Sequence, residues 1–240
     1  MIEITSLYKK FGKLQALDDI NLSFNNGECV ALIGPNGCGK TTLIKCILGM
    51  VMANKGIIKV KGQLISKSYK YREQIGYMPQ IGRYPDNMTI GQIIEMIKNI
   101  RKSEEPLDEY LLQHYLSRDM FDKSMRTLSG GTTQKVSATL AFLFNPDILI
   151  LDEPTAGLDP IASEILKDKI ITEKEKGKLI LITSHLLSEL DDLITHVVFM
   201  QEGQVKFHKT ISDLQQTTSE EKVSKAIATV LRNKMYESYH

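Results

Sequence analysis

The sequence has few cysteines and no long hydrophobic run. Its three cysteines, Cys29, Cys38 and Cys46, crowd into one short stretch without paired spacing. An odd count of this kind argues against a disulfide framework and indicates a reducing compartment. Apolar stretches such as residues 138–144, which Thr139 interrupts, are far shorter than the roughly 18 to 20 residues that a membrane-spanning helix requires. We therefore expect a cytoplasmic chain that does not cross a bilayer by itself.

The sequence also lacks a large net charge and a recognisable targeting segment. The 30 Lys and Arg residues are balanced by 29 Asp and Glu residues, which leaves a net charge of +1. This balance provides no global electric field for nucleic acid or a membrane surface, so the composition names no partner. The first residues alternate like a strand and place no basic flank before an apolar core. We expect no secretory signal.

The length of 240 residues and the hydrophobic content of 42% are typical of one large globular domain, with or without an inserted subdomain. Two stretches near the N-terminus show the apolar and polar alternation of strands. Their apolar positions are Ile2, Ile4, Leu7, Ile20, Leu22 and Phe24. We expect these stretches to pair as antiparallel strands.

The remaining chain alternates apolar runs with helical patterns. Four runs predict strands, at 29–33, 148–151, 179–183 and 197–200. Helices are predicted at 40–50, after Pro160, and in a segment that ends at Leu193. Because alternation of strands and helices implies parallel strands covered on both faces, we expect a mostly parallel, buried core sheet.

Two other segments have a helical pattern. Residues 81–125 predict an inserted helical subdomain, in which Thr89 and Gln92 form a capping box. Residues 220–234 predict an amphipathic terminal helix, which a second capping box of Thr218 and Glu221 would open.

A glycine-rich loop lies between the predicted strand 29–33 and the helix that follows. It fits the pattern G-x-x-x-x-G-K-[ST] and consists of Gly34, Pro35, Asn36, Gly37, Cys38, Gly39, Lys40 and Thr41, with Thr42 next in the chain. Glycines let backbone N–H groups approach phosphates closely, and the positive end of a helix faces the same charges. Lys40 would reach the β- and γ-phosphates, and the Thr41 hydroxyl would bind Mg²⁺. The alternative is a chance glycine turn.

Two acids, Asp152 and Glu153, end the apolar run 148–151. Asp152 would lie at the carboxyl edge of the sheet, where doubly wound folds bind ligands, and could hold Mg²⁺, usually through water. Glu153 is then left to polarise or deprotonate an attacking water. A solvated acidic turn before Pro154 is the alternative interpretation.

Further motifs complete a known pattern. They are Gln80 after Tyr77-Met78-Pro79, then Leu128-Ser129-Gly130-Gly131, Ala156-Gly157-Leu158-Asp159, and His185 after Ile182-Thr183-Ser184. With the phosphate loop and the acid pair, and in this order, they make residues 1–215 resemble the nucleotide-binding subunits of ABC transporters. The resemblance implies an α/β fold, a P-loop NTPase of ABC type with a mostly parallel core sheet, an antiparallel β subdomain and an inserted helical subdomain.

The resemblance also implies how the domains and copies are arranged. We expect the ATPase domain at 1–219, with the helical insert at about 81–125 and a signature helix reaching about 145, and a terminal helix and tail at 220–240. Two copies would stack head to tail as a homodimer. ATP would then lie between the phosphate loop of one copy and Ser129, Gly130 and Gly131 of the other, where a serine and two glycines at a helix start form a second anion cradle. The terminal helix could pack on its own domain or on the dimer mate.

Several single residues acquire roles from the resemblance. Phe11 would stack on the adenine, although a residue in this place can also be ordinary strand-edge packing. Gln80 would reach Mg²⁺ and the attacking water, and His185 would contact the γ-phosphate. Asp159 would cross the dimer interface, although an Asp before Pro160 is also a plain helix cap.

The expected catalytic set is therefore Glu153, His185, Gln80 and Lys40, and the expected Mg²⁺ ligands are Thr41, Gln80 and Asp152. One departure from the family pattern is Thr132, where many members have Gln after the signature glycines. We expect this shorter side chain to alter a contact at the start of the helix without removing the phosphate cradle.

The function implied is an ATP-hydrolysing subunit that drives a separate membrane permease from the inner face of the cell membrane. Within the family, residues 183–192 and 197–203 resemble ATPase subunits of the Nos system, which is linked to copper and to maturation of nitrous oxide reductase. A periplasmic copper-system protein would then be reached through the permease. An alternative is a soluble ABC ATPase of an iron–sulfur assembly scaffold. A nucleic-acid-directed ABC protein is disfavoured because the chain has one phosphate loop and no extended heptads.

Overall fold

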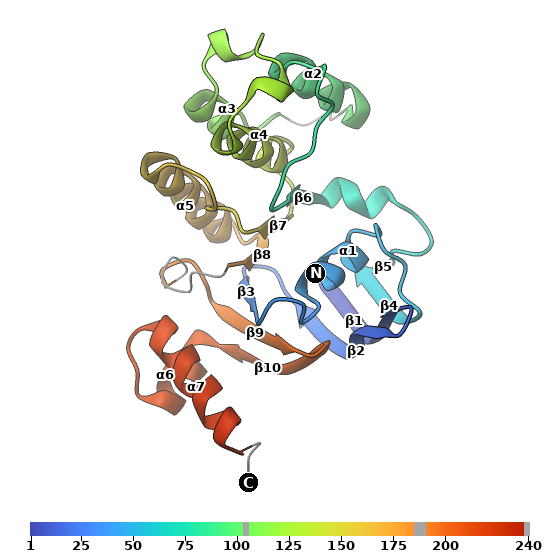
Figure 1. Cartoon of the computed structure of the whole chain (residues 1–240), viewed down its shortest axis with the longest axis vertical. Helices are drawn as coiled ribbons and strands as arrows, with labels where there is room; N and C mark the ends of the chain where they lie inside the picture. Colours follow the sequence, from blue (N-terminus) through green and yellow to red (C-terminus); the bar gives the residue numbers. More distant parts are fainter. Residues whose placement is uncertain (103–105, 185–190, 238–240) are drawn as a thin grey trace.

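The protein's structure, a computed structural model, describes residues 1–102, 106–184 and 191–237, with side chains as far as residue 232. Two β-sheets form its middle, and helices gather at both ends (Figure 1). The smaller sheet is antiparallel, with the strand order β2-β1-β4-β5. Its strands are β1 (Ile2–Phe11), β2 (Leu14–Phe24), β4 (Lys55–Val60) and β5 (Gln63–Leu64). The predicted antiparallel pairing near the N-terminus is confirmed.

The larger sheet has six strands in the order β10-β9-β3-β8-β7-β6. Its strands are β3 (Cys29–Ile33), β6 (Ile75–Met78), β7 (Ile148–Asp152), β8 (Leu179–Thr183), β9 (His196–Gln201) and β10 (Gln204–Thr210). All neighbours pair in parallel except β9 and β10, which form an antiparallel edge. The predicted parallel sheet is confirmed, and every residue of β3, β7 and β8 is buried.

Successive residues of the central strands contribute to two different hydrophobic cores. In β7, Ile148 and Ile150 pack with residues of the antiparallel sheet and of α1 (Lys40–Ile47). Leu149 and Leu151 pack with helices on the opposite face. Because side chains alternate across a strand, the six-stranded sheet is the middle layer between these two cores.

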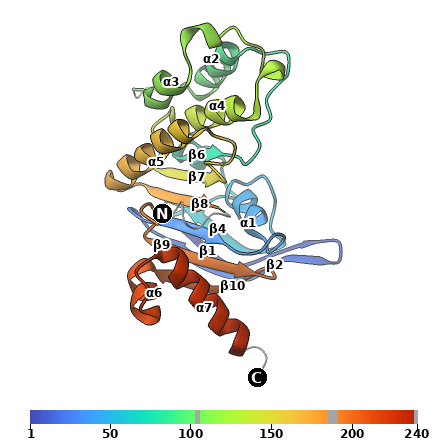
Figure 2. The ribbon, with the colours of Figure 1, turned by 60° about the vertical axis from the view of Figure 1, so that its left-hand side comes forward.

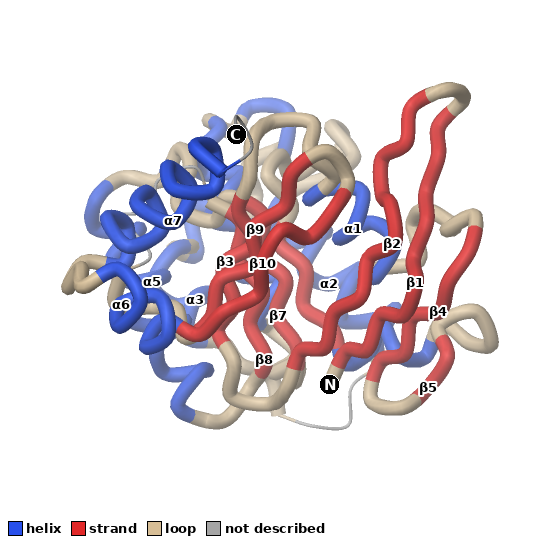
Figure 3. The backbone as a smooth tube through the Cα atoms, turned by 90° about the horizontal axis from the view of Figure 1, so that it is seen from below, coloured by secondary structure: helices blue, strands red, loops and turns tan. Residues whose placement is uncertain are grey.

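The two sheets meet where β2 runs beside the β9–β10 hairpin (Figure 3). The Asp18 amide donates to the carbonyl oxygen of Gly203 at 2.8 Å, and Gln204 Nε2 donates to the Asp18 carboxylate at 2.8 Å. A Cβ on Gly203 would lie 3.0 Å from the Ala16 carbonyl oxygen, so a glycine permits this close approach. These contacts tie the antiparallel sheet to the edge of the parallel one.

Apart from α1, the α-helices form two groups at opposite ends of the molecule (Figure 2). One end holds α2 (Ile90–Arg101), α3 (Tyr110–Tyr115) and α4 (Gly130–Phe142), with α5 (Pro160–Glu175) between them and the sheet. Short 3₁₀ helices lie at η1 (Lys70–Gln74), η2 (Arg118–Met120) and η3 (Met125–Thr127). The capping box of α2 is confirmed, because the Gln92 amide donates to Thr89 Oγ1 and the Thr89 amide donates to Gln92 Oε1.

The other end holds α6 (Ile211–Thr218) and α7 (Val223–Glu237). The predicted capping box of Thr218 and Glu221 is wrong. Thr218 closes α6, and its hydroxyl donates back to the carbonyl oxygen of Leu214 at 2.7 Å. The start of α7 is held from far along the chain, because the Ser224 amide donates to Asp191 Oδ1 at 3.0 Å. Spacing along the sequence could not reveal this distant cap.

The terminal helix packs on its own chain. Four of its apolar side chains are buried in the hydrophobic core that also holds Leu149 and Leu151 of β7. They are Val223, Ala226, Ile227 and Val230. The predicted helix that ends at Leu193 falls mostly on residues 185–190, which lie outside the described residues. In the described ranges, no helix combines the length and the apolar character that crossing a membrane would take.

A buried charge cluster joins α5 to the segment that precedes α3. Glu173, which is fully buried, pairs with Lys169 and Lys176 at 2.8 Å each and with Lys178. Lys169 also pairs with Asp108, which precedes α3. Burial raises the pKa of Glu173, but hydrogen bonds from the three lysines outweigh burial and lower this pKa to about 2.

We expect Glu173→Ala to lower the free energy of unfolding by about 3 kcal/mol or more at neutral pH, because the buried Lys178 ammonium loses its carboxylate partner and Lys169 loses one of two. The ordinary Glu pKa of 4.5 falls to about 2 in the folded state. The stabilisation is therefore complete above pH 4.5 and is lost as the pH falls towards 2, so wild type and variant should converge there. Urea unfolding at several pH values measures this.

Glu164→Ala on the same helix is the control, since Glu164 pairs with Lys167 at the surface. This variant should change the free energy of unfolding by about 0.5 kcal/mol or less. Equal losses in the two variants, or a Glu173 effect that does not vary with pH, would contradict the expectation.

Candidate functional site

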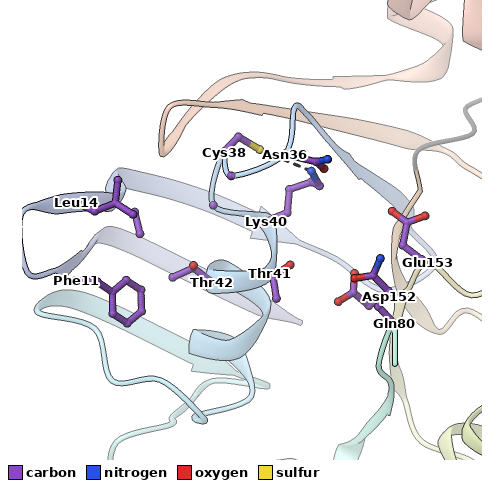
Figure 4. A pocket seen from close by; sticks show the side chains of 13 residues that line it. Phe11, Leu14, Asn36, Cys38, Lys40, Thr41, Thr42, Gln80, Asp152 and Glu153 are labelled. Atoms are coloured by element: carbon purple, nitrogen blue, oxygen red, sulfur yellow. Dashed lines mark hydrogen bonds between the residues drawn. The ribbon is translucent and has the colours of Figure 1, made fainter. Parts of the chain in front are cut away.

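A cleft of about 490 Å³ opens where the carboxyl ends of β3 and β7 face the β1–β2 hairpin (Figure 4). Its lining consists of Phe11, Leu14, Ala16, Asn36, Gly37, Cys38, Gly39, Lys40, Thr41, Thr42, Gln80, Asp152 and Glu153. Most residues singled out in the sequence thus come together in one place, although they are spread over more than half of the chain.

The phosphate loop forms one wall of the cleft. It follows β3 directly, and α1 begins at its end with Lys40. Gly34 and Gly39 have positive φ angles of 149° and 108°. A Cβ would lie 2.1 Å from the Met200 carbonyl oxygen at Gly34 and 2.5 Å from the Ala16 carbonyl oxygen at Gly39. Both the backbone conformation and the space therefore require glycine here.

The start of α1 is a positive end that faces the cleft. The first helical residues, Lys40, Thr41 and Thr42, all line it. Gly39 holds the N-cap position and has no side chain with which to satisfy the first amides of the helix. Unsatisfied amides and the helix dipole together favour an anion at this place.

Lys40 brings a cation to the same wall. Its side chain is buried, and Nζ donates to the carbonyl oxygens of Gly34 at 2.7 Å and Pro35 at 3.3 Å. These acceptors carry no charge, and no carboxylate of the described residues pairs with Lys40, so within that part of the chain the ammonium is hydrogen bonded but not neutralised. An anionic ligand in the cleft would supply the missing charge.

The acid pair forms the facing wall. Figure 4 shows Gln80, Asp152 and Glu153 across the cleft from Lys40 and Thr41. Asp152 is the last residue of β7 and is 6% exposed. Burial raises the pKa of the neighbouring Tyr77 to about 12, and the negative charge of Asp152 adds to this rise.

Together these walls offer oxygen ligands of the kind that Mg²⁺ prefers. A hydroxyl from Thr41, a carboxylate from Asp152 and an amide oxygen from Gln80 line one end of the cleft. Hard cations such as Mg²⁺ bind carboxylate, carbonyl and hydroxyl oxygens. The donor set therefore fits the ion that the sequence led us to expect.

An apolar surface lies at the other end. Phe11 and Leu14 come from the β1–β2 hairpin, on the far side of the loop from the acids (Figure 4). The Phe11 ring is 47% exposed, with Lys9 Nζ 4.7 Å from its centroid. An exposed ring beside the cleft fits a flat ligand better than it fits strand-edge packing, the alternative for this residue.

Six of the predicted residues that the structure describes do not line this cleft. Gly34 and Pro35 begin the phosphate loop, and the other four lie farther along the chain. Ser129, Gly130 and Gly131 lie at the start of α4, where Ser129 Oγ accepts the Thr132 amide at 3.2 Å. Asp159 caps α5 by accepting the Ala162 amide at 2.9 Å and pairs with Lys135 at 2.7 Å. The hydrogen bond from Lys135 lowers the pKa of Asp159.

The helix-cap role that remained open for Asp159 is present. The Thr132 hydroxyl lies 2.9 Å from Ser129 Oγ, so this residue contacts the cap of α4; that the contact is altered relative to Gln stays a prediction. The predicted site residue His185 lies outside the described residues.

Sequence reasoning missed three residues. Leu14 and Ala16 line the cleft, but nothing in their pattern separates them from other strand residues. Thr183 ends β8 and hydrogen bonds with Asp152 and with the Glu153 amide. Its place directly after an apolar run was a signal, because polar residues at strand carboxyl ends gather at one edge of a parallel sheet.

Comparisons with known proteins agree with this geometry. The profile of the ABC transporter family matches residues 17–156. The uncharacterized ABC transporter ATP-binding protein YdbJ of Bacillus subtilis is 34% identical over 223 residues, which cover 91% of this chain and 72% of that protein. The chain belongs to the ABC transporter family. It contains an ABC-type ATPase domain of the P-loop ATP hydrolase family.

Other relatives extend this finding. The human phospholipid-transporting ATPase ABCA3 is 36% identical over 209 residues, which cover 85% of this chain but 12% of that protein. The chain thus spans a small part of the first curated relatives that it matches. A solved ATP-binding subunit of an ABC transporter superposes with a TM-score of 0.87 at 28% identity, covering 96% of this chain and 99% of that one. The predicted ABC-type fold is confirmed.

We expect Lys40→Ala to abolish productive nucleotide binding, because it removes the buried ammonium that the neutral carbonyls leave uncompensated. Titration with a fluorescent ATP analogue measures the loss. The control is Lys45→Ala, whose side chain is exposed on the same helix. Wild-type affinity in Lys40→Ala, or equal losses in both variants, would contradict the expectation.

Proposed function

We propose that the cleft binds ATP with Mg²⁺ and that the side chains lining it carry out hydrolysis. The observation that carries this proposal is the meeting of phosphate loop and acid pair across one cleft. Lys40 and the amides at the start of α1 bind the phosphates, and Phe11 stacks on the adenine. Thr41, Asp152 and Gln80 hold Mg²⁺, which when bound neutralises charge that develops on the phosphates.

Glu153 orients the attacking water and accepts its proton. Its carboxylate stands next to Asp152 in the chain and faces the phosphate loop (Figure 4). A base in this position needs correct geometry before it needs a shifted pKa. His185 contacts the γ-phosphate in this proposal, which for that residue rests on the family resemblance.

The site becomes complete in a dimer. Ser129, Gly130 and Gly131 lie outside their own chain's cleft, so we assign them to the nucleotide held by a second copy, and Asp159 to the contact between copies. A solved ATP-binding cassette whose title describes a dimeric post-hydrolysis state with ADP and Pi superposes with a TM-score of 0.77 at 23% identity. At this identity the likeness supports the fold, and the dimer stays our proposal.

Nucleotide binding then drives motion through a difference in affinity. A ligand that contacts both copies only when they are closed shifts the equilibrium towards the closed dimer. Moving a two-state gate from 1:99 to 99:1 takes about 5.5 kcal/mol of differential binding. Hydrolysis removes the γ-phosphate contact and lets the dimer reopen.

The closing and reopening of the dimer drive a membrane permease. The subunit is held at the inner face of the cell membrane. Two relatives support this step by their names: YdbJ, and the Nod factor export ATP-binding protein I of Ralstonia nicotianae, which is 28% identical over 213 residues covering 65% of that protein. We assign the contact with the permease to the helical insert at about 81–125. Residues 1–219 form the ATPase domain in this proposal. The segment 82–87 beside Gln80 is the place where a permease helix would dock.

The finer assignment is to the copper-linked maturation of nitrous oxide reductase. Its support is the resemblance of residues 183–192 and 197–203 to Nos-type subunits, and none of the relatives named above carries such a description. Across the described ranges, no group of three His, Cys, Asp or Glu side chains could hold a metal ion. The proposal therefore leaves copper handling to a periplasmic partner reached through the permease. An iron–sulfur assembly ATPase is the alternative function.

We expect Glu153→Gln to keep ATP binding but to arrest hydrolysis, because the amide cannot accept the proton of the attacking water. The variant should accumulate an ATP-bound dimer, which light scattering detects. Glu164→Gln, an exposed change on α5, is the control and should turn over at the wild-type rate. Unchanged turnover in Glu153→Gln would exclude the base assignment.

The partner is identified by purifying tagged Glu153→Gln protein with Mg·ATP from gently solubilised native membranes, with ADP in a parallel sample. We expect a polytopic membrane protein to be enriched in the ATP sample. A copper-system component beside it would support the Nos assignment. Soluble assembly proteins alone would overturn the transport proposal and favour the iron–sulfur alternative.

A further inference from the structure

The hydroxyl of Thr183 lies between the two acids of the cleft. Thr183 is the last residue of β8, and it pairs with Asp152, the last residue of β7, across the parallel ladder. Its side chain points away from solvent, since the residue is 1% exposed. Neither the family motifs nor the comparisons assign it a role.

A single hydroxyl can donate one hydrogen bond and accept others. Thr183 Oγ1 donates to Asp152 Oδ1 at 2.5 Å and accepts from the Glu153 amide at 3.0 Å. The carbonyl oxygen of Thr183 accepts from the same amide at 3.2 Å. One residue of β8 thus contacts the carboxylate of Asp152 and the backbone of Glu153 at the same time.

Glu153 needs such a restraint because its backbone is strained. Its φ angle is +52°, in the left-handed region that non-glycine residues rarely adopt. Residues held there are strained and persist only where the surroundings hold them in place. A glycine would relieve the strain but would remove the carboxylate.

The carbonyl group of Glu153 is held as well. The Glu153 carbonyl oxygen accepts from the Ala156 amide at 3.1 Å and from Gln134 Nε2 of α4 at 3.4 Å. These contacts fix the turn after β7 from its far end. Thr183 is the contact that links this turn to the carboxylate of Asp152.

We propose that Thr183 is a positioning residue for ATP hydrolysis, whose hydroxyl sets the placement of Asp152 and Glu153 relative to each other. The inference rests on the roles proposed above for these two acids. Valine has nearly the shape of threonine but neither donates nor accepts, so in its place the Asp152 carboxylate and the Glu153 amide each lose a partner. Serine keeps the hydroxyl and loses a methyl group.

The test compares Thr183→Val and Thr183→Ser with wild type in steady-state ATP hydrolysis. In Thr183→Val we expect kcat to fall about tenfold or more, since two hydrogen bonds at the acids are lost. The KM for ATP should stay close to the wild-type value, because the phosphate loop is untouched. Thr183→Ser should recover most of kcat.

A second readout does not depend on activity. Hydrogen exchange of the Glu153 amide, measured on peptides spanning residues 152–157, should be faster in Thr183→Val than in wild type or Thr183→Ser. Thr139→Val is the matched control, because Thr139 is also 1% exposed and its hydroxyl donates only within α4, to the carbonyl oxygen of Lys135. This control should leave kcat and the Glu153 exchange rate unchanged.

Three results would overturn the positioning role: wild-type kcat in Thr183→Val, equal kcat losses in the Val and Ser variants, or a loss in Thr139→Val as large as in Thr183→Val. If Thr183→Val does not fold, Thr183→Cys takes its place, and its weakly donating thiol should give a kcat below that of Thr183→Ser. Glu153→Gln runs in the same assay. Turnover in that variant at the wild-type rate would refute the proposed base, whereas its arrest together with full activity in Thr183→Val would refute the present inference alone.

Discussion

The parallel pairing of β3, β8 and β7 determines where the functional groups of this protein lie. Because the three strands run in the same direction, the residues that follow them meet at one edge of the sheet: the phosphate loop after β3, the acids at the end of β7, and Thr183 at the end of β8. The loop supplies positive charge and the facing wall supplies oxygen ligands. The two walls are complementary to the ligand proposed above, a chain of phosphates with a divalent cation.

Much of this arrangement could be predicted from the sequence, for identifiable reasons. The strands of the parallel sheet are continuous apolar runs, and the phosphate loop combines its glycines with Lys40 at a spacing that chance rarely produces. Both signals are local, so they can be recognised without knowledge of the fold. The capping box of Thr89 and Gln92 was found in the same way.

What escaped prediction depends on contacts between distant parts of the chain. The start of α7 is held by Asp191, not by the nearby Thr218, and no local pattern announces that bond. The edge strand β10 was missed because its burial is mixed, which weakens the alternation of apolar and polar residues. Thr183 looked like the end of an apolar run until the register of β7 and β8 placed it opposite Asp152.

The alternation of the central strands has a consequence for how the protein can change over evolutionary time. Neighbouring residues of β7 belong to different cores, Leu149 to the helical side and Ile150 to the side of α1 and the antiparallel sheet. Substitutions at two adjacent positions of the strand therefore disturb different sets of side chains. Compensating changes for each arise in a different core. Selection can remodel the helical layer for a new partner while the layer beneath the phosphate loop keeps its packing.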